Sequence, residues 1–510
     1  MSGPHSILFR AYSQDGVIER EHLLAEFAAA GFDSDNPIAR ELIAAVRACD
    51  SVLDEAAFEK LYDCSPALLA QILEGNLIIA DFRGFRAQIE EIFNQVRENR
   101  DGQVASYIPQ LEKVDPDKFA VALCSIDGQR MNLGESSDYF CVQSCSKPLT
   151  YCIALEQLGV EEVHRFVGRE PSGKTFNELT LNAHGLPHNP MINAGAIMCG
   201  ALIERGKSPA ERFDAVLDIW REAAGGDCRI GFNNAVYLSE KQTGDRNYAL
   251  GHFMREKKAF PDGTTLADVL EFYFQCCSIE TSVETLSVLA ATLANGGHCP
   301  LSGKMVFRPE NVKNCLSLML SCGMYDFSGE FAFTVGMPAK SGVSGAILLV
   351  VPNTCGIAIW SPRLDELGNS VRGVDFCRKL VSRFRLHTFD QMVGLNDGRL
   401  DPRRSTYEER LGGGTFFLWA CANGDTSEMR RLVARGVDPA VANYDDRTGL
   451  HIASSAGQLE AVRYLLKVGV PVNREDRWGN RPLDDAIREG NDLVAALLKE
   501  YGAECKTATV

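Results

Sequence analysis

Three stretches of the chain differ in how apolar and polar residues are spaced, and each spacing predicts a different kind of structure. Near the N-terminus, Leu23, Leu24, Phe27 and Ala28 recur with a period close to 3.6, which predicts helices over residues 1–95. Residues 96–396 mix helical patterns with short continuous apolar runs, which predicts an α+β domain. The helical patterns are Ala210 to Ala224 and Leu266 to Ile279, and the strand-like runs are Phe119 to Ser125, Ala346 to Val351 and Gly356 to Trp360.

Residues 405–505 repeat with a period of 33. Thr448-Gly449-Leu450-His451 is followed by Ala453, Gly457 and Leu465. This spacing resembles the ankyrin repeat, and about three copies are expected. Stacked ankyrin helix pairs present a concave surface, so the array predicts a protein partner. The equivalents at 33-residue offsets are Pro482, Leu483, Asp484, Ala486, Gly490 and Leu498 in one direction and Phe417, Ala420, Gly424 and Leu432 in the other.

The segment Ser13 to Ile18 resembles half of an EF-hand calcium loop. When Gly16 is aligned with the invariant glycine of that loop, Ala11 takes the first ligand position and His22 takes the twelfth. Neither residue supplies the carboxylate that calcium needs. We therefore expect residues 1–95 to form a degenerate, EF-hand-like helical domain that holds no calcium.

Composition narrows the class of protein. The 510 residues carry 68 acidic and 52 basic side chains, and the net charge of −16 argues against binding to nucleic acid or to anionic membranes. The 17 cysteines are scattered without a C-x-x-C pair, which is typical of reduced thiols in a cytosol-like compartment. No histidine or cysteine cluster has the spacing of a metal site, and no apolar run is long enough to span a membrane.

One phosphate-loop pattern is judged to be a coincidence. Gly168 to Thr175 fits G-x-x-x-x-G-K-[ST], but that motif binds phosphate only between a buried strand and a helix. The preceding segment, Val160 to Val167, contains His164 and Arg165, and no sustained helical pattern follows. A surface loop is the better interpretation.

Two short motifs together indicate serine acyl transfer. Ser144 and Lys147 form an S-x-x-K motif followed by Pro148 and an apolar helical pattern, so one helical turn would place both side chains on one face. A desolvated lysine can activate a serine hydroxyl. Lys340-Ser341-Gly342 precedes the strand-like run Ala346 to Val351, and this pair of motifs is the signature of β-lactamases and penicillin-binding proteins. An exposed lysine at a strand end is the alternative interpretation of Lys340.

Longer motifs resemble those of the glutaminases, in particular the phosphate-activated kidney and liver enzymes of animals. The resemblance covers residues 10 to 503 and implies a serine β-lactamase-like fold between the helical front domain and the ankyrin array. It also implies hydrolysis of L-glutamine to L-glutamate and ammonia. The motifs are Tyr107 to Leu111, Gln143 to Pro148, His188 to Ile197, Gly244 to Asn247 and Ser321 to Gly329.

The resemblance also implies roles for individual residues. Ser144 would attack the side-chain amide, Lys147 would take its proton, and Tyr325 would assist proton transfer. The backbone amides of Ser144 and Val343 would hold the oxyanion. The positions that match the family's substrate-binding residues are Tyr107, Gln143, Ser144, Asn193, Glu240, Asn247, Tyr273, Tyr325 and Val343.

The resemblance implies no metal and no organic cofactor, inorganic phosphate as a candidate activator, and a homodimer or homotetramer. The chain lacks the long N-terminal extension of the animal enzymes, so a cytoplasmic location is expected, with a mitochondrial one if a transit peptide has been removed. Two other functions remain open, a penicillin-recognising acyl transferase and a non-catalytic ankyrin scaffold. Reduced thiols argue against the first, and the joint presence of Ser144, Lys147, Tyr325 and Lys340 argues against the second.

Overall fold

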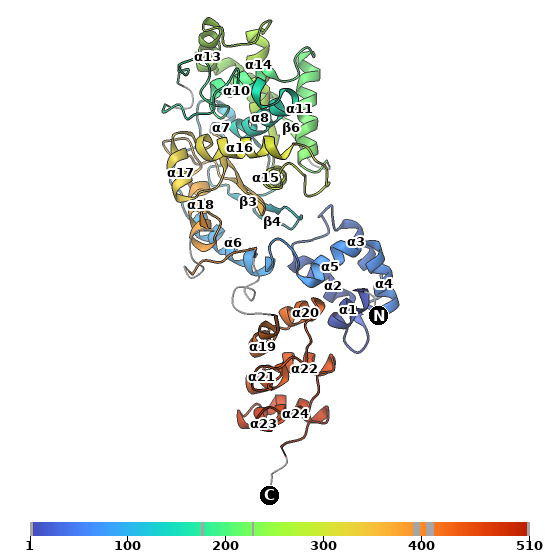
Figure 1. The fold of residues 1–510 in the computed structure, drawn as a ribbon. Helices are drawn as coiled ribbons and strands as arrows, with labels where there is room; N and C mark the ends of the chain where they lie inside the picture. Colours follow the sequence, from blue (N-terminus) through green and yellow to red (C-terminus); the bar gives the residue numbers. More distant parts are fainter. Residues whose placement is uncertain (1–3, 175–177, 227–228, 391–397, 404–412, 507–510) are drawn as a thin grey trace. The chain divides into compact units, whose positions relative to one another are not determined.

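The structure is a computed structural model, and it describes residues 4–174, 178–226, 229–390, 398–403 and 413–506. The chain divides into two compact units (Figure 1). One unit comprises residues 84–402, and the other combines residues 1–83 with residues 403–510. Thr175, the last residue of the phosphate-loop pattern, lies outside the described residues, as does the start of the predicted ankyrin segment at 405–412.

A five-stranded antiparallel sheet forms the centre of the first unit, with strand order β4-β3-β10-β9-β8. Every residue of β3, β9 and β10 is buried, which explains why these strands appear in the sequence as continuous apolar runs. All three predicted strands are confirmed to within a residue or two. The strands are β3 (Ala120–Ser125), β4 (Arg130–Gly134), β8 (Ala339–Ser341), β9 (Ala346–Val351) and β10 (Cys355–Trp360).

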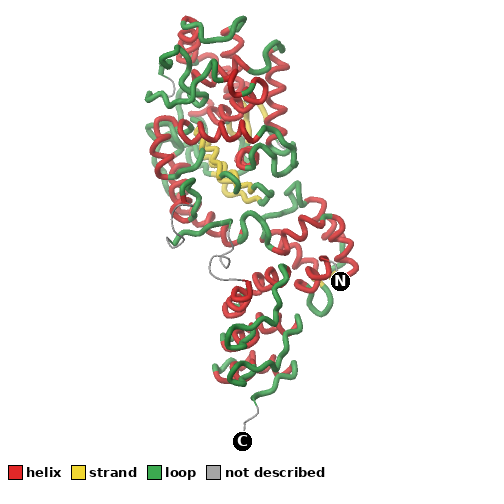
Figure 2. Tube along the Cα trace, in the orientation of Figure 1, coloured by secondary structure: helices red, strands yellow, loops and turns green. Residues whose placement is uncertain are grey.

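Helices cover both faces of this sheet (Figures 1 and 2). On one face, α15 (Val283–Ala294) lies so close to β10 that a Cβ atom at Gly356 would be 2.0 Å from the backbone nitrogen of Ala291. On the other face, α6 (Phe82–Arg97) stacks the ring of Phe93 on Phe119 at a centroid distance of 4.4 Å. Only glycine permits the first contact, because the backbone of the helix occupies the space of a side chain.

A second helical layer and a small three-stranded sheet complete the unit. Helix α8 is almost entirely buried, so its sequence lacks a polar face. The helices are α7 (Pro109–Glu112), α8 (Lys147–Leu158), α9 (Val160–Val163), α10 (Asn193–Leu202), α11 (Pro209–Ala223), α12 (Asn234–Thr243), α13 (Asp245–Glu256), α14 (Leu266–Cys277), α16 (Pro309–Cys322), α17 (Ser328–Thr334) and α18 (Val371–Arg383). The small sheet has the order β5-β7-β6, with β5 (Phe140–Cys141), β6 (Gly231–Phe232) and β7 (Ile279–Thr281).

The other unit packs an N-terminal group of helices against stacked helix pairs. Ala434 is buried in the N-terminal core, the Nη2 atom of Arg435 donates to the carbonyl of Gly75 at 2.7 Å, and the hydroxyl of Tyr464 donates to the carbonyl of Ala11 at 3.3 Å. The N-terminal elements are α1 (Pro4–Tyr12), β1 (Ile18–Glu19), α2 (Arg20–Ala29), α3 (Arg40–Ala48), β2 (Val52–Leu53), α4 (Glu55–Cys64) and α5 (Pro66–Glu74). The stacked pairs are α19 (Gly413–Asn423) with α20 (Thr426–Ala434), α21 (Gly449–Ser455) with α22 (Leu459–Lys467), and α23 (Pro482–Arg488) with α24 (Asp492–Glu500).

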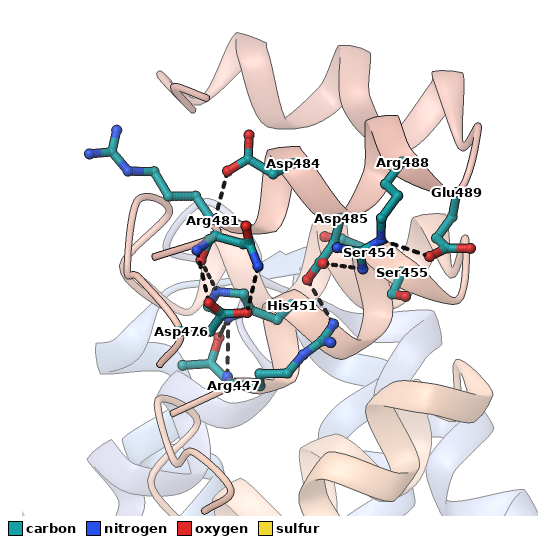
Figure 3. Close-up of polar contacts among 12 residues, drawn as sticks. Arg447, His451, Ser454, Ser455, Asp476, Arg481, Asp484, Asp485, Arg488 and Glu489 are labelled. Atoms are coloured by element: carbon teal, nitrogen blue, oxygen red, sulfur yellow. Dashed lines mark hydrogen bonds and ion pairs between the residues drawn. The ribbon is translucent and has the colours of Figure 1, made fainter. Parts of the chain in front are cut away.

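A buried carboxylate links the second and third helix pairs (Figure 3). Asp485 is fully buried and accepts hydrogen bonds from Arg447 at 2.7 Å and from Arg488 at 2.5 Å. Nearby, the Nδ1 atom of His451 lies 3.0 Å from the hydroxyl of Thr448. Burial of a charged carboxylate costs free energy, and the hydrogen bonds from the guanidinium groups of Arg447 and Arg488 offset that cost.

Candidate active site

The serine of the S-x-x-K motif lies in a tight turn that leads into a helix. Ser144 belongs to the 3-10 turn Gln143–Ser146, and α8 begins at Lys147 with Pro148 in its first turn. Ser144 therefore lies in the turn that leads directly into the N-terminus of α8. Gln143 has a left-handed backbone, with φ at 49°, which turns the chain sharply between β5 and α8. A non-glycine residue in this conformation costs about 1–3 kcal/mol, so the surrounding structure must hold it.

Both members of the motif are buried in the domain. Ser144 is 7% exposed and Lys147 is 1% exposed. The Nζ atom of Lys147 donates to Oδ1 of Asn193 at 2.7 Å. Burial lowers the pKa of Lys147 to about 8, because the charged amine loses its hydration. The neighbouring hydroxyl of Ser146 donates to the carbonyl of Gln143 at 2.8 Å and so belongs to the turn.

Tyr325 reaches the same place from a distant part of the sequence. It begins the 3-10 turn Tyr325–Phe327 that follows α16, and its phenol lies close enough to the side chain of Ser144 for the serine to influence the phenol's pKa. Burial raises the pKa of Tyr325, so its phenol keeps its proton at neutral pH. Its backbone is also left-handed, with φ at 53°.

Lys340 lies against Tyr325 and is fully buried, which overturns the alternative of an exposed strand-end lysine. Its Nζ atom lies 4.5 Å from the centre of the Tyr325 ring and donates to the carbonyl of Ser341 at 2.7 Å. Burial, and then the nearby charge of Lys147, lower the pKa of Lys340 well below its usual value. Two buried amines of lowered pKa, those of Lys147 and Lys340, therefore lie near enough to each other for their charges to interact.

The turn between β8 and β9 approaches the backbone of Ser144 closely. A Cβ atom at Gly342 would lie 2.8 Å from the carbonyl oxygen of Val142 and 3.5 Å from the backbone nitrogen of Ser144. Val343 follows and packs, partly buried, against the small apolar cluster that contains Ile108 and Cys141. The segments that carry the amides of Ser144 and Val343 are therefore neighbours, as a two-donor oxyanion hole requires.

A second group of predicted residues surrounds Glu240 on α12. Its Oε1 atom accepts hydrogen bonds from the hydroxyl of Tyr107 at 2.6 Å and from Nε2 of Gln143 at 3.0 Å. Tyr273 lies near enough to Glu240 for the carboxylate charge to raise the pKa of its phenol, although burial is the larger cause. Burial raises the pKa of Glu240 itself. A buried carboxylate held by neutral donors is suited to a cationic group of a ligand.

Two asparagines connect Lys147 to the helical layer. Asn193 begins α10, and its Nδ2 atom donates to Oδ1 of Asn247 on α13 at 3.0 Å. Hydrogen bonds thus join Lys147, Asn193 and Asn247 into one group and Tyr107, Gln143 and Glu240 into another.

Cys277 is a buried residue near Glu240 and Lys147 that the sequence interpretation missed. Its thiol is buried and lies close enough to Tyr273, Glu240 and Lys147 for each of them to influence its pKa. Burial raises its pKa, so the thiol stays protonated. The sequence feature that could have identified Cys277 was its position one helical turn after Tyr273 on α14.

A cavity of about 420 Å³ opens beside Tyr325. Its lining includes Lys174 from the loop with the phosphate-loop pattern, Asn189 and Ile192 before α10, and Ser321 at the end of α16. The described part of that loop therefore borders the candidate active site. Across the described parts of the chain, no group of three histidine, cysteine or acidic side chains could hold a metal ion.

The catalytic unit has a β-lactamase-like fold, and comparison with known proteins identifies its family. The family model named Glutaminase matches residues 102–389, and a model of three ankyrin repeats matches residues 417–509. The chain belongs to the glutaminase family. Its class is that of a glutamine amidohydrolase.

Relatives and solved structures agree with this membership. The mouse liver glutaminase isoform, named as mitochondrial, is 49% identical over 88% of this chain and 75% of its own length. Putative glutaminase 3 of Caenorhabditis elegans is 40% identical over 98% of this chain and 88% of its own. The solved structure of the probable glutaminase ybaS has a TM-score of 0.56 at 35% identity, covering 58% of this chain and 95% of that one. The structure of Mglu in its glutamate form has the same TM-score at 39% identity, over 60% and 69% of the two chains.

Proposed function

We propose that this glutaminase hydrolyses L-glutamine through an acyl-enzyme on Ser144. The hydroxyl oxygen attacks the side-chain amide carbon while the neutral amine of Lys147 takes the hydroxyl proton. The carbon–nitrogen bond then breaks, and Tyr325 passes a proton to the departing ammonia. Water attacks the resulting γ-glutamyl ester and releases L-glutamate, and the proton returns to Ser144. The observation that carries this proposal is the buried Lys147, whose pKa of about 8 leaves part of its amine neutral at physiological pH.

The oxyanion in both steps is held by backbone amides. The turn at Gly342 brings Val343 next to the backbone of Ser144, and this close approach supports the pair of donors. Removing one such donor costs about a hundredfold or more in rate in comparable enzymes.

The Glu240 group binds the amino-acid end of the substrate. The buried carboxylate of Glu240 pairs with the α-ammonium group, and the raised pKa that burial gives it falls when that cation arrives. Tyr107, Gln143 and Tyr273 donate hydrogen bonds to the carboxylate groups of this pocket and its ligand. Asn193 and Asn247 orient Lys147 and border the same space.

The test is the Ser144→Ala variant in an ammonia-release assay, with the Thr334→Ala variant on the exposed part of α17 as a matched control. We expect no ammonia release from Ser144→Ala, normal release from the control, and unchanged thermal unfolding of both. An electrophilic glutamine analogue should add its mass to the peptide that contains Ser144. Labelling of another residue would refute the assignment of the nucleophile.

The chemistry as proposed uses only protein groups and water, with inorganic phosphate as a candidate activator. We further propose a homodimer or homotetramer and a protein partner for the ankyrin array. A reducing compartment, the cytoplasm or the mitochondrial matrix, fits the described cysteines, all of which are free thiols. None of the helices in the described ranges is long and apolar enough to cross a bilayer.

A further inference from the structure

Tyr325 holds a backbone conformation that a bulky side chain does not adopt without support. Its φ of 53° is in the left-handed region, and it is not a glycine. In this conformation the phenol lies close enough to the side chain of Ser144 for the serine to influence the phenol's pKa. Strain of this kind, about 1–3 kcal/mol, persists only where neighbouring groups fix the chain.

The hydroxyl of Ser328 bonds to peptide groups on both sides of Tyr325. It accepts a hydrogen bond from the backbone nitrogen of Met324 at 3.0 Å and donates one to the carbonyl of Tyr325 at 2.6 Å. Ser328 is 5% exposed, so water does not compete for these bonds. Although Ser328 begins α17, its hydroxyl is directed back to the preceding turn and caps none of the amides of that helix.

A second contact that holds the Tyr325 turn comes from the loop before α18. Asn369 is fully buried, and its Nδ2 atom donates to the carbonyl of Met324 at 3.4 Å. Its backbone is fixed in turn by Asp365, which accepts from the Asn369 nitrogen at 2.9 Å. At Gly368 an added Cβ atom would stand 3.8 Å from the Tyr325 ring, so this loop also lies against the phenol.

We propose that Ser328, supported by Asn369, is a positioning residue that holds the Tyr325 phenol against the nucleophile. The inference rests on the proposed function, because it matters only if Tyr325 takes part in proton transfer. Without the Ser328 hydroxyl, Tyr325 can relax to the right-handed conformation, and the phenol then swings away from Ser144. A misplacement of about 1 Å at a reacting group can cost a hundredfold in rate.

The test compares Ser328→Ala with Thr334→Ala, which removes a hydroxyl bonded to the carbonyl of Glu330 on the exposed part of the same helix. Ammonia release is measured at saturating glutamine and at one fixed phosphate concentration. We expect kcat of Ser328→Ala to fall about tenfold to a hundredfold while KM stays within threefold of the wild type. The control should keep both constants, and thermal unfolding is recorded for each variant.

The Tyr325→Phe variant separates positioning from a general structural role. If Ser328 acts through the phenol, Ser328→Ala should add no further loss of kcat in the Tyr325→Phe background. If Ser328→Ala lowers kcat by the same factor in the wild-type and Tyr325→Phe backgrounds, the inference is overturned. It is also overturned if Ser328→Ala alone keeps kcat within threefold of the wild type. Wild-type turnover by Tyr325→Phe alone would instead overturn the proposed proton transfer by Tyr325.

Asn369→Ser provides an independent variant if Ser328→Ala proves unfolded at the assay temperature. It removes the hydrogen bond to Met324 from the other side of the turn. We expect the same selective loss of kcat. A folded Asn369→Ser protein with wild-type kcat would show that Asn369 does not help to hold the turn that positions Tyr325.

Discussion

The pH dependence of turnover follows from the burial of Lys147. A general base must be neutral to accept a proton, and burial lowers the pKa of Lys147 to about 8. The neutral fraction of such an amine is about 3% at pH 6.5 and about 76% at pH 8.5, so kcat should rise about 25-fold between these values. A lysine with the ordinary value of 10.5 would rise about a hundredfold over the same interval without levelling off.

The assay measures ammonia release at saturating glutamine in buffers of constant ionic strength from pH 6 to 8.5. This upper limit keeps most of the substrate's own α-ammonium groups protonated. We expect a midpoint near pH 8 in the wild type and in Lys257→Met, an exposed lysine on the surface of the same unit. We expect no measurable turnover from Lys147→Met. A flat profile, or a limb still rising with full slope at pH 8.5, would show that Lys147 is not the base.

Three further outcomes follow from individual contacts. Glu240→Gln should raise KM at least thirtyfold with a smaller effect on kcat, because a buried charge that pairs with a substrate cation is worth about 2–5 kcal/mol. KM is measured by ammonia release, and an unchanged KM would place the α-ammonium elsewhere. Asp485→Asn should destabilise the helix pairs by about 1–3 kcal/mol, because Arg447 loses a charged acceptor, and limited proteolysis of residues 413–506 should detect this. Gly356→Ala should lower the melting temperature of the catalytic unit, because its new Cβ would meet the backbone of Ala291 at 2.0 Å, and unchanged melting would contradict that contact.

Lys147 also shows how the same burial affects stability. The folded protein lowers the pKa of this amine, so the unfolded chain binds a proton more readily over the interval between about 8 and 10.5. The free energy of unfolding therefore increases as pH rises through that interval. Below about pH 8 the full cost of burying this amine is present, and the free energy of unfolding is lower. The burial that makes the amine of Lys147 neutral and reactive therefore lowers the stability of the fold, as is common for groups at active sites.

Local patterns were sufficient for much of the fold. The strands at Ala120–Ser125 and Ala346–Val351 are continuous apolar runs because both of their faces are covered, and such runs can be recognised without coordinates. The helix at Leu266–Cys277 was predicted to continue to Ile279, but Ile279 instead pairs in β7. The end of the helix was misplaced because Ile279 keeps the apolar character of the helix while bonding to a distant strand.

The candidate site was predicted in part from chemistry and in part from resemblance. The spacing of Ser144 and Lys147 indicated a nucleophile and a base, and Lys340 completed a recognisable signature. Tyr107, Glu240 and Tyr273 carried no signal of their own, since tyrosines and single carboxylates occur in every core and surface. Only the resemblance to a family selected them, and the structure then placed them in hydrogen-bonding or electrostatic contact.

The sequence by itself determined which side chains are present and which local elements they favour, because helical periodicity, continuous apolar runs and a 33-residue repeat are properties of near neighbours. Tertiary structure alone decided the protonation of those side chains and their mutual distances. Lys147 is a weak base because distant segments exclude water from it, and Tyr325 meets Ser144 because a left-handed turn is held by Ser328 and Asn369. Burial and long-range contact arise only when the chain is folded, so no local pattern encodes them.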